Sequence, residues 1–175
     1  STKGQYARAL LFSKKSFETV KDISNEDTAY ISAAGRLAGD YYTLLKVDSA
    51  LFYFVKACEG AGKRYGAAST QYGNLLVSAA MAYMELGQYQ EAEQRFQNAT
   101  AVLIRRDSSY QKDAYAYCLT EHAGFYITTG SLNKAEELCL EACKIALMAP
   151  IDMNDYASAL VKLNWLYEKL GFHSK

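Results

Sequence analysis

Apolar residues recur at intervals of three and four along almost the whole chain, with polar residues between them. This spacing is typical of amphipathic α-helices, because it places the apolar residues on one face of a helix with 3.6 residues per turn. Runs of β-branched residues are few, and Pro150 is the single proline among 175 residues. The pattern therefore predicts an all-α chain with no strands.

The periodic segments form two alternating sets of predicted helices. The first set comprises residues 26–44, 69–86, 108–129 and 151–170. The second set comprises residues 5–20, 47–65, 88–105 and 131–148. Each first-set helix is followed closely by a second-set helix, which predicts antiparallel helix pairs joined by short turns.

A small residue repeats at a nearly constant interval in the second set. Four anchor alanines are separated by 41, 42 and 43 residues, and each is followed seven positions later by another small residue. The anchors are Ala9, Ala50, Ala92 and Ala135, and the residues that follow them are Ser16, Ala57, Ala99 and Ala142. Small side chains let two helix backbones approach closely, so we expect these positions to be buried.

The first set carries a matching pattern of larger residues. A tyrosine stands near the end of each predicted helix, at Tyr42, Tyr83, Tyr126 and Tyr167. Gly87, Gly130 and Gly171 follow four residues later and predict a tight reversal, because glycine tolerates positive φ. In the first full repeat Lys46 stands where this glycine is expected, and one residue is missing there.

The repeat divides the chain into one predicted array over residues 1–175. It consists of a half-repeat at 1–22, repeats at 26–66, 69–106 and 108–148, and a half-repeat at 151–175. A half-repeat at each end leads us to expect a fragment of a longer protein. Terminal helices with uncovered apolar faces invite self-association.

The pattern resembles the tetratricopeptide repeat (TPR), in which eight residues hold fixed places in a helix-turn-helix unit. In the second repeat they are Leu76, Ala80, Tyr83, Gly87, Tyr89, Ala92, Phe96 and Ala99. In the third they are Leu119, Ala123, Tyr126, Gly130, Leu132, Ala135, Cys139 and Ala142. The first repeat matches at Gly39, Tyr42, Ala50, Phe54 and Ala57, and the last half-repeat at Leu160, Tyr167 and Gly171.

The long period is similar to that of kinesin light chains and of many bacterial regulatory proteins. The resemblance implies a right-handed superhelical solenoid of antiparallel helix pairs, with the first-set helices lining a concave groove. The predicted groove residues are Asn74, Val77, Met81, Met84, Glu85, Tyr117, Thr120, Glu121, Lys162 and Trp165. Exposed Met, Tyr and Trp are enriched at recognition surfaces, although packing between neighbouring repeats is the alternative for each residue.

Two binding modes of the wider family are not matched. The kinesin light chain type carries paired asparagines on its first helices, whereas Val77 with Ser78 and Thr120 with Glu121 stand at the corresponding positions. Other members clamp a C-terminal carboxylate, which Glu85 and Glu121 would repel. The expected groove is therefore of mixed character.

Composition narrows the class of partner. Nineteen Lys and Arg balance nineteen Asp and Glu, so nothing general attracts nucleic acid or an anionic membrane. No apolar run reaches the roughly 18 residues that span a bilayer. Four cysteines do not form a disulfide framework and fit a reducing compartment. We expect a cytoplasmic protein that binds a protein or peptide, without membrane insertion.

No residues are spaced like a known catalytic set. The only histidines, His122 and His173, have no nucleophile or carboxylate at a catalytic spacing. The segment GAGKRYG at residues 60–66 superficially suggests a phosphate-binding loop, but a helix precedes it where a strand is required, so we expect a loop between repeats. The sequence therefore predicts no enzyme activity and no cofactor.

A zinc site is the one alternative chemistry. Cys118 and His122 stand four residues apart on one predicted helix, and Cys139 and Cys143 stand four apart on its partner. Because Cys118 lies one residue off the packing stripe, we expect ordinary packing and no metal.

Two basic pairs end consecutive second-set helices. They are Lys63 with Arg64 and Arg105 with Arg106. Cations at these places ordinarily complement the helix dipole, and a stripe for an acidic partner is the alternative.

These features predict a non-catalytic protein-interaction module or scaffold that binds a peptide or a partner helix in its groove. Two alternatives remain open at this point. One is a peptide-sensing regulatory domain coupled to an output domain, and the other is a self-assembling structural spacer in a large complex.

Overall fold

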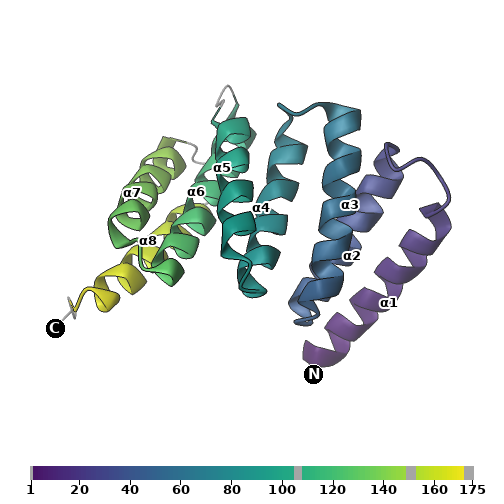
Figure 1. Ribbon diagram of the computed structural model, residues 1–175, viewed down its shortest axis with the longest axis horizontal. Helices are drawn as coiled ribbons and strands as arrows, with labels where there is room; N and C mark the ends of the chain where they lie inside the picture. Colours follow the sequence, from purple (N-terminus) through teal and green to yellow (C-terminus); the bar gives the residue numbers. More distant parts are fainter. Residues whose placement is uncertain (1, 105–107, 149–152, 172–175) are drawn as a thin grey trace. The chain divides into compact units, whose positions relative to one another are not determined.

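The computed structural model describes residues 2–104, 108–148 and 153–171, and within these ranges it contains eight α-helices and no strand (Figure 1). The helices are α1 (Thr2–Val20), α2 (Thr28–Thr43), α3 (Val47–Tyr65), α4 (Thr70–Glu85), α5 (Tyr89–Leu103), α6 (Ser109–Thr129), α7 (Leu132–Met148) and α8 (Met153–Lys169). Every predicted helix is confirmed, with ends within three residues of those expected. The predicted basic pair Arg105–Arg106 and His173 lie outside the described residues.

Side-chain caps begin three of the four first-set helices, α2, α4 and α6. Asp27 accepts a hydrogen bond from the Ala29 backbone N–H, and Ser69 accepts one from that of Tyr72. Ser108 forms a capping box with Gln111. The Ser108 side chain accepts a hydrogen bond from the Gln111 backbone N–H, and the Gln111 side chain accepts one from the Ser108 backbone N–H. These caps satisfy donors that a helix start leaves unpaired, and they fix where each repeat begins.

The helices α4 and α6 end in the predicted left-handed turn. Gly87 and Gly130 have φ of 72° and 83°. The Gln88 backbone N–H donates a hydrogen bond to the Tyr83 carbonyl at 3.0 Å, and the Ser131 N–H donates one to the Tyr126 carbonyl at 2.8 Å. In both cases the donor stands five residues after the packing tyrosine of its repeat. This bond closes a Schellman motif, which satisfies carbonyls at the helix end and turns the chain into the next helix.

The turn after α2 corrects the predicted register of the first full repeat. There the positive φ, 58°, belongs to Leu45, and the N–H of Lys46 donates to the carbonyl of Tyr41 at 2.9 Å. Tyr41 and Leu45 therefore hold the places assigned from the sequence to Tyr42 and Lys46. No residue is missing, because the turn residue is simply not a glycine.

Replacing Leu45 with glycine should stabilise the protein. A left-handed φ costs a non-glycine residue about 1–2 kcal/mol, whereas Leu45 is 83% exposed and contributes little packing. Because glycine loses more entropy on folding, we expect a net gain of about 0.5–1 kcal/mol in the free energy of unfolding, measured by urea titration. Gly87→Ala, with open space around its new Cβ, should lose about 1 kcal/mol. A loss from Leu45→Gly would contradict this account.

The predicted small residues are fully buried in three of the four second-set helices. They are Ala50, Ala57, Ala92, Ala99, Ala135 and Ala142. In α1 the prediction is wrong, because Ser16 is exposed and Ala9 only half-buried. Ser16 lines an open hollow between α1 and α2, which accounts for its exposure.

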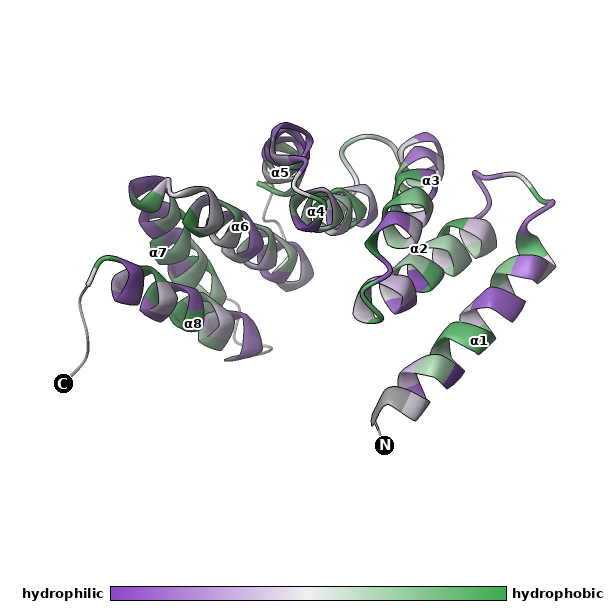
Figure 2. Ribbon diagram, turned by 60° about the horizontal axis from the view of Figure 1, so that its bottom comes forward, coloured by the Kyte–Doolittle hydropathy of each residue, from purple (hydrophilic) through white to green (hydrophobic). Residues whose placement is uncertain are grey.

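The helices cluster into two compact units, which we call the N-terminal unit (Ser1–Arg95) and the C-terminal unit (Phe96–Lys175). In the N-terminal unit α2 packs against α1 and α3, and α3 packs against α4. In the C-terminal unit α6 packs against α7, and both contact α8. Hydrophobic and hydrophilic residues alternate along each helix, as amphipathic packing requires (Figure 2).

Each unit contains an aromatic cluster. In the N-terminal unit the ring of Phe17 lies 5.3 Å from that of Tyr30 and 5.1 Å from that of Tyr53. In the C-terminal unit the His122 ring stacks on Phe96 at 5.0 Å and on Tyr126 at 4.6 Å. Such ring pairs add to the free energy gained from burial.

The segment GAGKRYG is helical up to Tyr65, so the expectation of a loop between repeats is wrong. Gly66 ends α3 with φ of 85°. Gly60 is buried, and a Cβ there would overlap the Asn25 carbonyl oxygen in the connection between α1 and α2. This glycine therefore serves close packing of the backbone.

Candidate partner-binding surfaces

The predicted groove residues divide between the two units. In the N-terminal unit α4 carries five of them, of which Glu85 is exposed and Asn74, Met81 and Met84 are half-buried. Val77 is completely buried, so its assignment to a binding surface is wrong. The open part of this face is thus a methionine-rich strip beside one carboxylate.

The C-terminal unit holds the other five. Tyr117 on α6 and Trp165 on α8 are each 36% exposed, while Glu121 and Lys162 are half-buried. Thr120 is only 1% exposed, and its hydroxyl donates to the Ala116 carbonyl at 2.9 Å. The assignment of Thr120 to a binding surface is therefore also wrong.

The burial of Val77 and Thr120 follows from their place in the repeat, six residues before the packing tyrosine. The equivalent in α2 is Gly35, where a Cβ would lie 3.4 Å from the Leu75 side chain on α4. In α2 this position thus faces α4, the next first-set helix, rather than open solvent. Val161 holds it in α8 and is 68% exposed, since no helix of the described chain follows α8.

Glu121 and Lys162 pair with each other instead of presenting free charges. The Lys162 Nζ lies 3.6 Å from the Glu121 Oε2, and both side chains are largely buried. A Cβ at Gly124 would lie 2.8 Å from the same Nζ, so the lysine crosses closely over α6. The ion pair links α6 to α8, and the repulsion of an anionic ligand predicted for Glu121 is largely cancelled.

Tyr117 and Trp165 stand close in sequence to the two members of this ion pair. Tyr117 stands one helical turn before Glu121, and Trp165 stands about one turn after Lys162. The Lys169 Nζ lies 5.5 Å from the centre of the Trp165 ring, a cation–π distance. The surface thus offers two aromatic faces around a neutralised polar contact, which suits apolar or aromatic side chains of a peptide.

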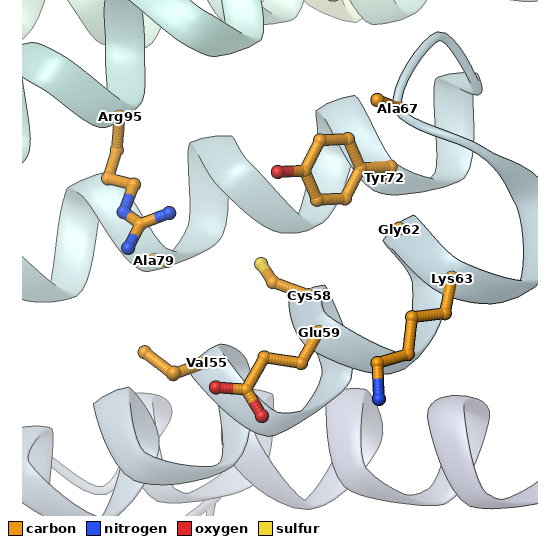
Figure 3. A pocket seen from close by; sticks show the side chains of 9 residues that line it. All are labelled: Val55, Cys58, Glu59, Gly62, Lys63, Ala67, Tyr72, Ala79 and Arg95. Atoms are coloured by element: carbon orange, nitrogen blue, oxygen red, sulfur yellow. The ribbon is translucent and has the colours of Figure 1, made fainter. Parts of the chain in front are cut away.

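A hollow of about 340 Å³ in the N-terminal unit was not predicted (Figure 3). It is lined by Val55, Cys58, Glu59, Gly62, Lys63, Ala67, Tyr72, Ala79 and Arg95. Figure 3 shows Arg95 entering from α5 and Tyr72 from α4, opposite Cys58 on α3. The sequence analysis considered Gly62 and Lys63 as part of the GAGKRYG segment but predicted no hollow there, and the lone Arg95 carries no pattern that would have identified it.

Burial favours the protonated form of the thiol in this hollow. Burial raises the pKa of Cys58 to about 12, and the opposing effect of the Arg95 charge is smaller. A thiol with such a pKa stays protonated at neutral pH, and only the thiolate attacks or binds metal well.

A second hollow, of about 460 Å³, lies in the C-terminal unit between α5, α6 and α7. Its lining includes His122, Tyr126 and Lys134, and the Lys134 Nζ is 4.9 Å from the centre of the Tyr126 ring. Because the buried His122 ring is stacked between two aromatic rings, it serves packing in this unit.

The four zinc candidates do not form a metal site. Cys118 Sγ lies 3.6 Å from the Thr100 hydroxyl on α5, and burial raises the pKa of Cys118 to about 12 and that of Cys139 to about 11. No group of three His, Cys, Asp or Glu in the described ranges is placed to hold a metal ion. Nor is any helix among these residues long and apolar enough to cross a membrane.

No protein-family model matches the sequence, and no curated protein sequence matches it. Solved structures do resemble the chain. The TPR-like repeats of a kinesin light chain-like protein from Podospora anserina match at 18% identity and a TM-score of 0.75, over 97% of this chain and 81% of theirs. BtubC from P. vanneervenii matches at 16% identity and a TM-score of 0.78, over 97% and 68%.

A third similar structure is a Rap protein in complex with Competence and Sporulation Factor. It matches at 15% identity with a TM-score of 0.69, over 93% of this chain, which spans about half of the Rap chain (49%). At such identities the likeness concerns the fold. The predicted all-α, TPR-like helical repeat is thereby confirmed.

Proposed function

We propose that this chain is a non-catalytic protein-interaction module that binds a peptide or a helix of a protein partner on its first-set helices. The observation that carries the proposal is the exposed aromatic pair, Tyr117 and Trp165, beside the Glu121–Lys162 ion pair. Large aromatic side chains at a desolvated contact supply most of the binding free energy in protein interfaces. The strip of Met81, Met84 and Glu85 is a separate candidate surface on the N-terminal unit.

A protein partner in the cytoplasm fits the remaining features. The balanced charge favours neither nucleic acid nor an anionic membrane. All four cysteines are free, and three of them are buried, which supports a reducing compartment.

Tyr117→Ala should weaken peptide binding by about 10- to 30-fold, the effect of losing one central aromatic contact. Peptides would first be selected on the wild-type chain from a displayed random library, and their affinity then measured by titration calorimetry. Trp165→Ala should have a similar effect. The matched control is Tyr89→Ala, which removes an exposed tyrosine from the second-set helix α5.

Two results would contradict the proposal. One is that no peptide is enriched on the folded wild-type chain. The other is that binding survives both aromatic changes but is lost in Tyr89→Ala, which would place recognition on the second-set helices.

A peptide-sensing regulatory domain is the second candidate function. The structural similarity to a Rap protein crystallised with Competence and Sporulation Factor favours it. In that case short soluble peptides should raise the thermal stability of the isolated chain, whereas a scaffold for folded partner helices should respond only to longer ones.

A further inference from the structure

We propose that the hollow lined by α3, α4 and α5 in the N-terminal unit binds a small organic acid, whose carboxylate pairs with Arg95 and whose apolar body lies against α3 and α4. This site is separate from the aromatic surface proposed above for peptides, and it does not depend on that proposal.

The hollow has the size and lining of a small-molecule site. Its volume of about 340 Å³ lies at the lower end of the range for ligand pockets, roughly 300–1,000 Å³. Apolar surface comes from Val55, Ala67 and Ala79, and only a few side chains in the lining are polar. Such a combination holds the body of a ligand by burial and fixes its orientation by a small number of polar contacts.

Arg95 is an exception to the repeat pattern. It stands three positions after the anchor Ala92, where the other repeats carry an aromatic or aliphatic residue, namely Phe12, Tyr53 and Leu138. In the C-terminal unit Leu138 lines the corresponding hollow. A charged residue at a place that is otherwise apolar is a departure expected at a functional site.

Gly62 keeps the hollow open on the side of α3. It stands twelve positions after the anchor Ala50, where the two later repeats carry Ile104 and Leu147. A Cβ at Gly62 would lie 3.3 Å from the Tyr72 ring, so a larger side chain would fill the space between α3 and α4. The hollow therefore exists because this place lacks a large side chain.

The guanidinium of Arg95 has no counter-ion in the part of the chain that the structure describes. Arg95 is half-buried, and none of the ion pairs among the described residues includes it. Lys63, the other cation of the lining, lies 3.8 Å from the Glu26 Oε1. Glu59 is exposed, so water screens its charge. A partly desolvated cation without a partner favours the binding of an anion.

Three hydrogen-bond donors from three helices face this space (Figure 3). They are the Arg95 guanidinium from α5, the Tyr72 hydroxyl from α4 and the Cys58 thiol from α3. Among the described residues the Tyr72 hydroxyl makes no hydrogen bond. Tyr115, its equivalent in the next repeat, donates its hydroxyl to the Glu141 Oε1 at 3.1 Å. A tyrosine at this repeat position thus binds a carboxylate elsewhere in the same chain.

A carboxylate fits the hollow better than a phosphate. The guanidinium presents its N–H groups in a planar fork that matches the two oxygens of a carboxylate. Arg95 is the one cation of the lining without a described counter-ion, so it neutralises a monoanion, whereas a phosphate dianion would add a second negative charge near Glu59. Burial raises the pKa of Cys58 to about 12, which keeps the thiol neutral, so it does not repel an anion.

The test compares 3-phenylpropionate with its neutral amide, 3-phenylpropanamide, which has nearly the same shape. Butyrate serves as a second, smaller acid. An NMR titration of the wild-type chain should give a dissociation constant on the order of 1 mM for 3-phenylpropionate, as expected for a ligand of this size. The amide should bind at least about 10-fold more weakly, because it lacks the charge that strengthens the hydrogen bonds from Arg95.

Arg95→Leu should weaken binding of the acid at least about 10-fold and leave binding of the amide unchanged. This variant restores the residue type of Leu138, so it should fold, and a circular dichroism melt would establish this. Tyr72→Phe removes only the hydroxyl and should weaken binding of the acid by about 3- to 10-fold. The matched control is Arg64→Leu, which removes an exposed arginine of α3 outside the lining and should bind the acid like the wild type.

The proposal is overturned if neither acid shifts the NMR signals of the lining residues, or if the amide binds as tightly as the acid. It is equally overturned if Arg95→Leu keeps the wild-type affinity, or if Arg64→Leu weakens binding as much as Arg95→Leu. Tyr117→Ala, which tests the peptide surface, should leave binding of the acid unchanged, so the two proposals fail independently.

Discussion

Replacing Gly60 with alanine should lower the free energy of unfolding by about 3 kcal/mol. The added Cβ would overlap the carbonyl oxygen of Asn25 and lie 2.9 Å from the Ile31 Cγ1. A backbone oxygen cannot move aside by rotation about a side-chain bond, so α3 or the connection between α1 and α2 must shift. Either movement loosens the packing of α3 against α2, which a urea titration would measure.

Gly39→Ala is the matched control, since it also adds one methyl group to a helical glycine. No atom lies within 4 Å of the new Cβ at Gly39, so only the backbone effect remains. Alanine favours the helix by about 0.5–1 kcal/mol over glycine, and we expect a gain of that size. Similar changes in stability for the two variants would contradict the steric explanation.

The contrast between these glycines shows what a repeat pattern can and cannot reveal. The anchor Ala50 and the small residue Ala57 predicted the packing of α3, because small residues recur at these positions at a fixed interval. Gly60 belongs to no such series, since its role depends on one loop that crosses α3 at a single place. A contact that occurs once leaves no periodic signal in the sequence.

The register error in the first full repeat has the same origin. Glycine marks the turn after α4 and α6, and its absence after α2 left Tyr42 and Lys46 as the apparent match. The hydrogen bond from the Lys46 N–H to the Tyr41 carbonyl shows that the turn geometry is kept without glycine. The left-handed turn is thus kept after α2 although Leu45 replaces the preferred glycine. The leucine lowers the free energy of unfolding, and Leu45→Gly should restore it.

The candidate site was predicted only in part, for a related reason. Helical periodicity tells which side of a helix faces its own partner, and on this basis Tyr117 and Trp165 were correctly expected to keep exposed surface. It does not tell which residues a third helix covers. Thr120 points toward the next first-set helix and is buried, whereas Val161 at the same repeat position is exposed because α8 is the last described helix.

Phe96→Ala should produce a loss of about 3–5 kcal/mol, as expected for truncating a fully buried phenylalanine. Phe96 has no exposed surface, and its ring stacks on His122 at 5.0 Å and lies 5.8 Å from that of Phe125. Alanine leaves a cavity where the ring now packs against His122 and Phe125, and the lost contacts add to the lost burial. The loss would be a large share of the roughly 5–15 kcal/mol that stabilises a typical domain.

Phe52→Ala makes the same chemical change on α3 at a side chain that is mostly exposed, and it should cost less than about 1 kcal/mol. Urea titrations of both variants, monitored by circular dichroism, would show how much of the loss depends on the burial of the side chain, since both variants make the same Phe→Ala change. If Phe96→Ala were as mild as Phe52→Ala, the large aromatic would not fill the space beside the anchor alanines. The pairing of large with small residues, on which the repeat depends, would then lose its support.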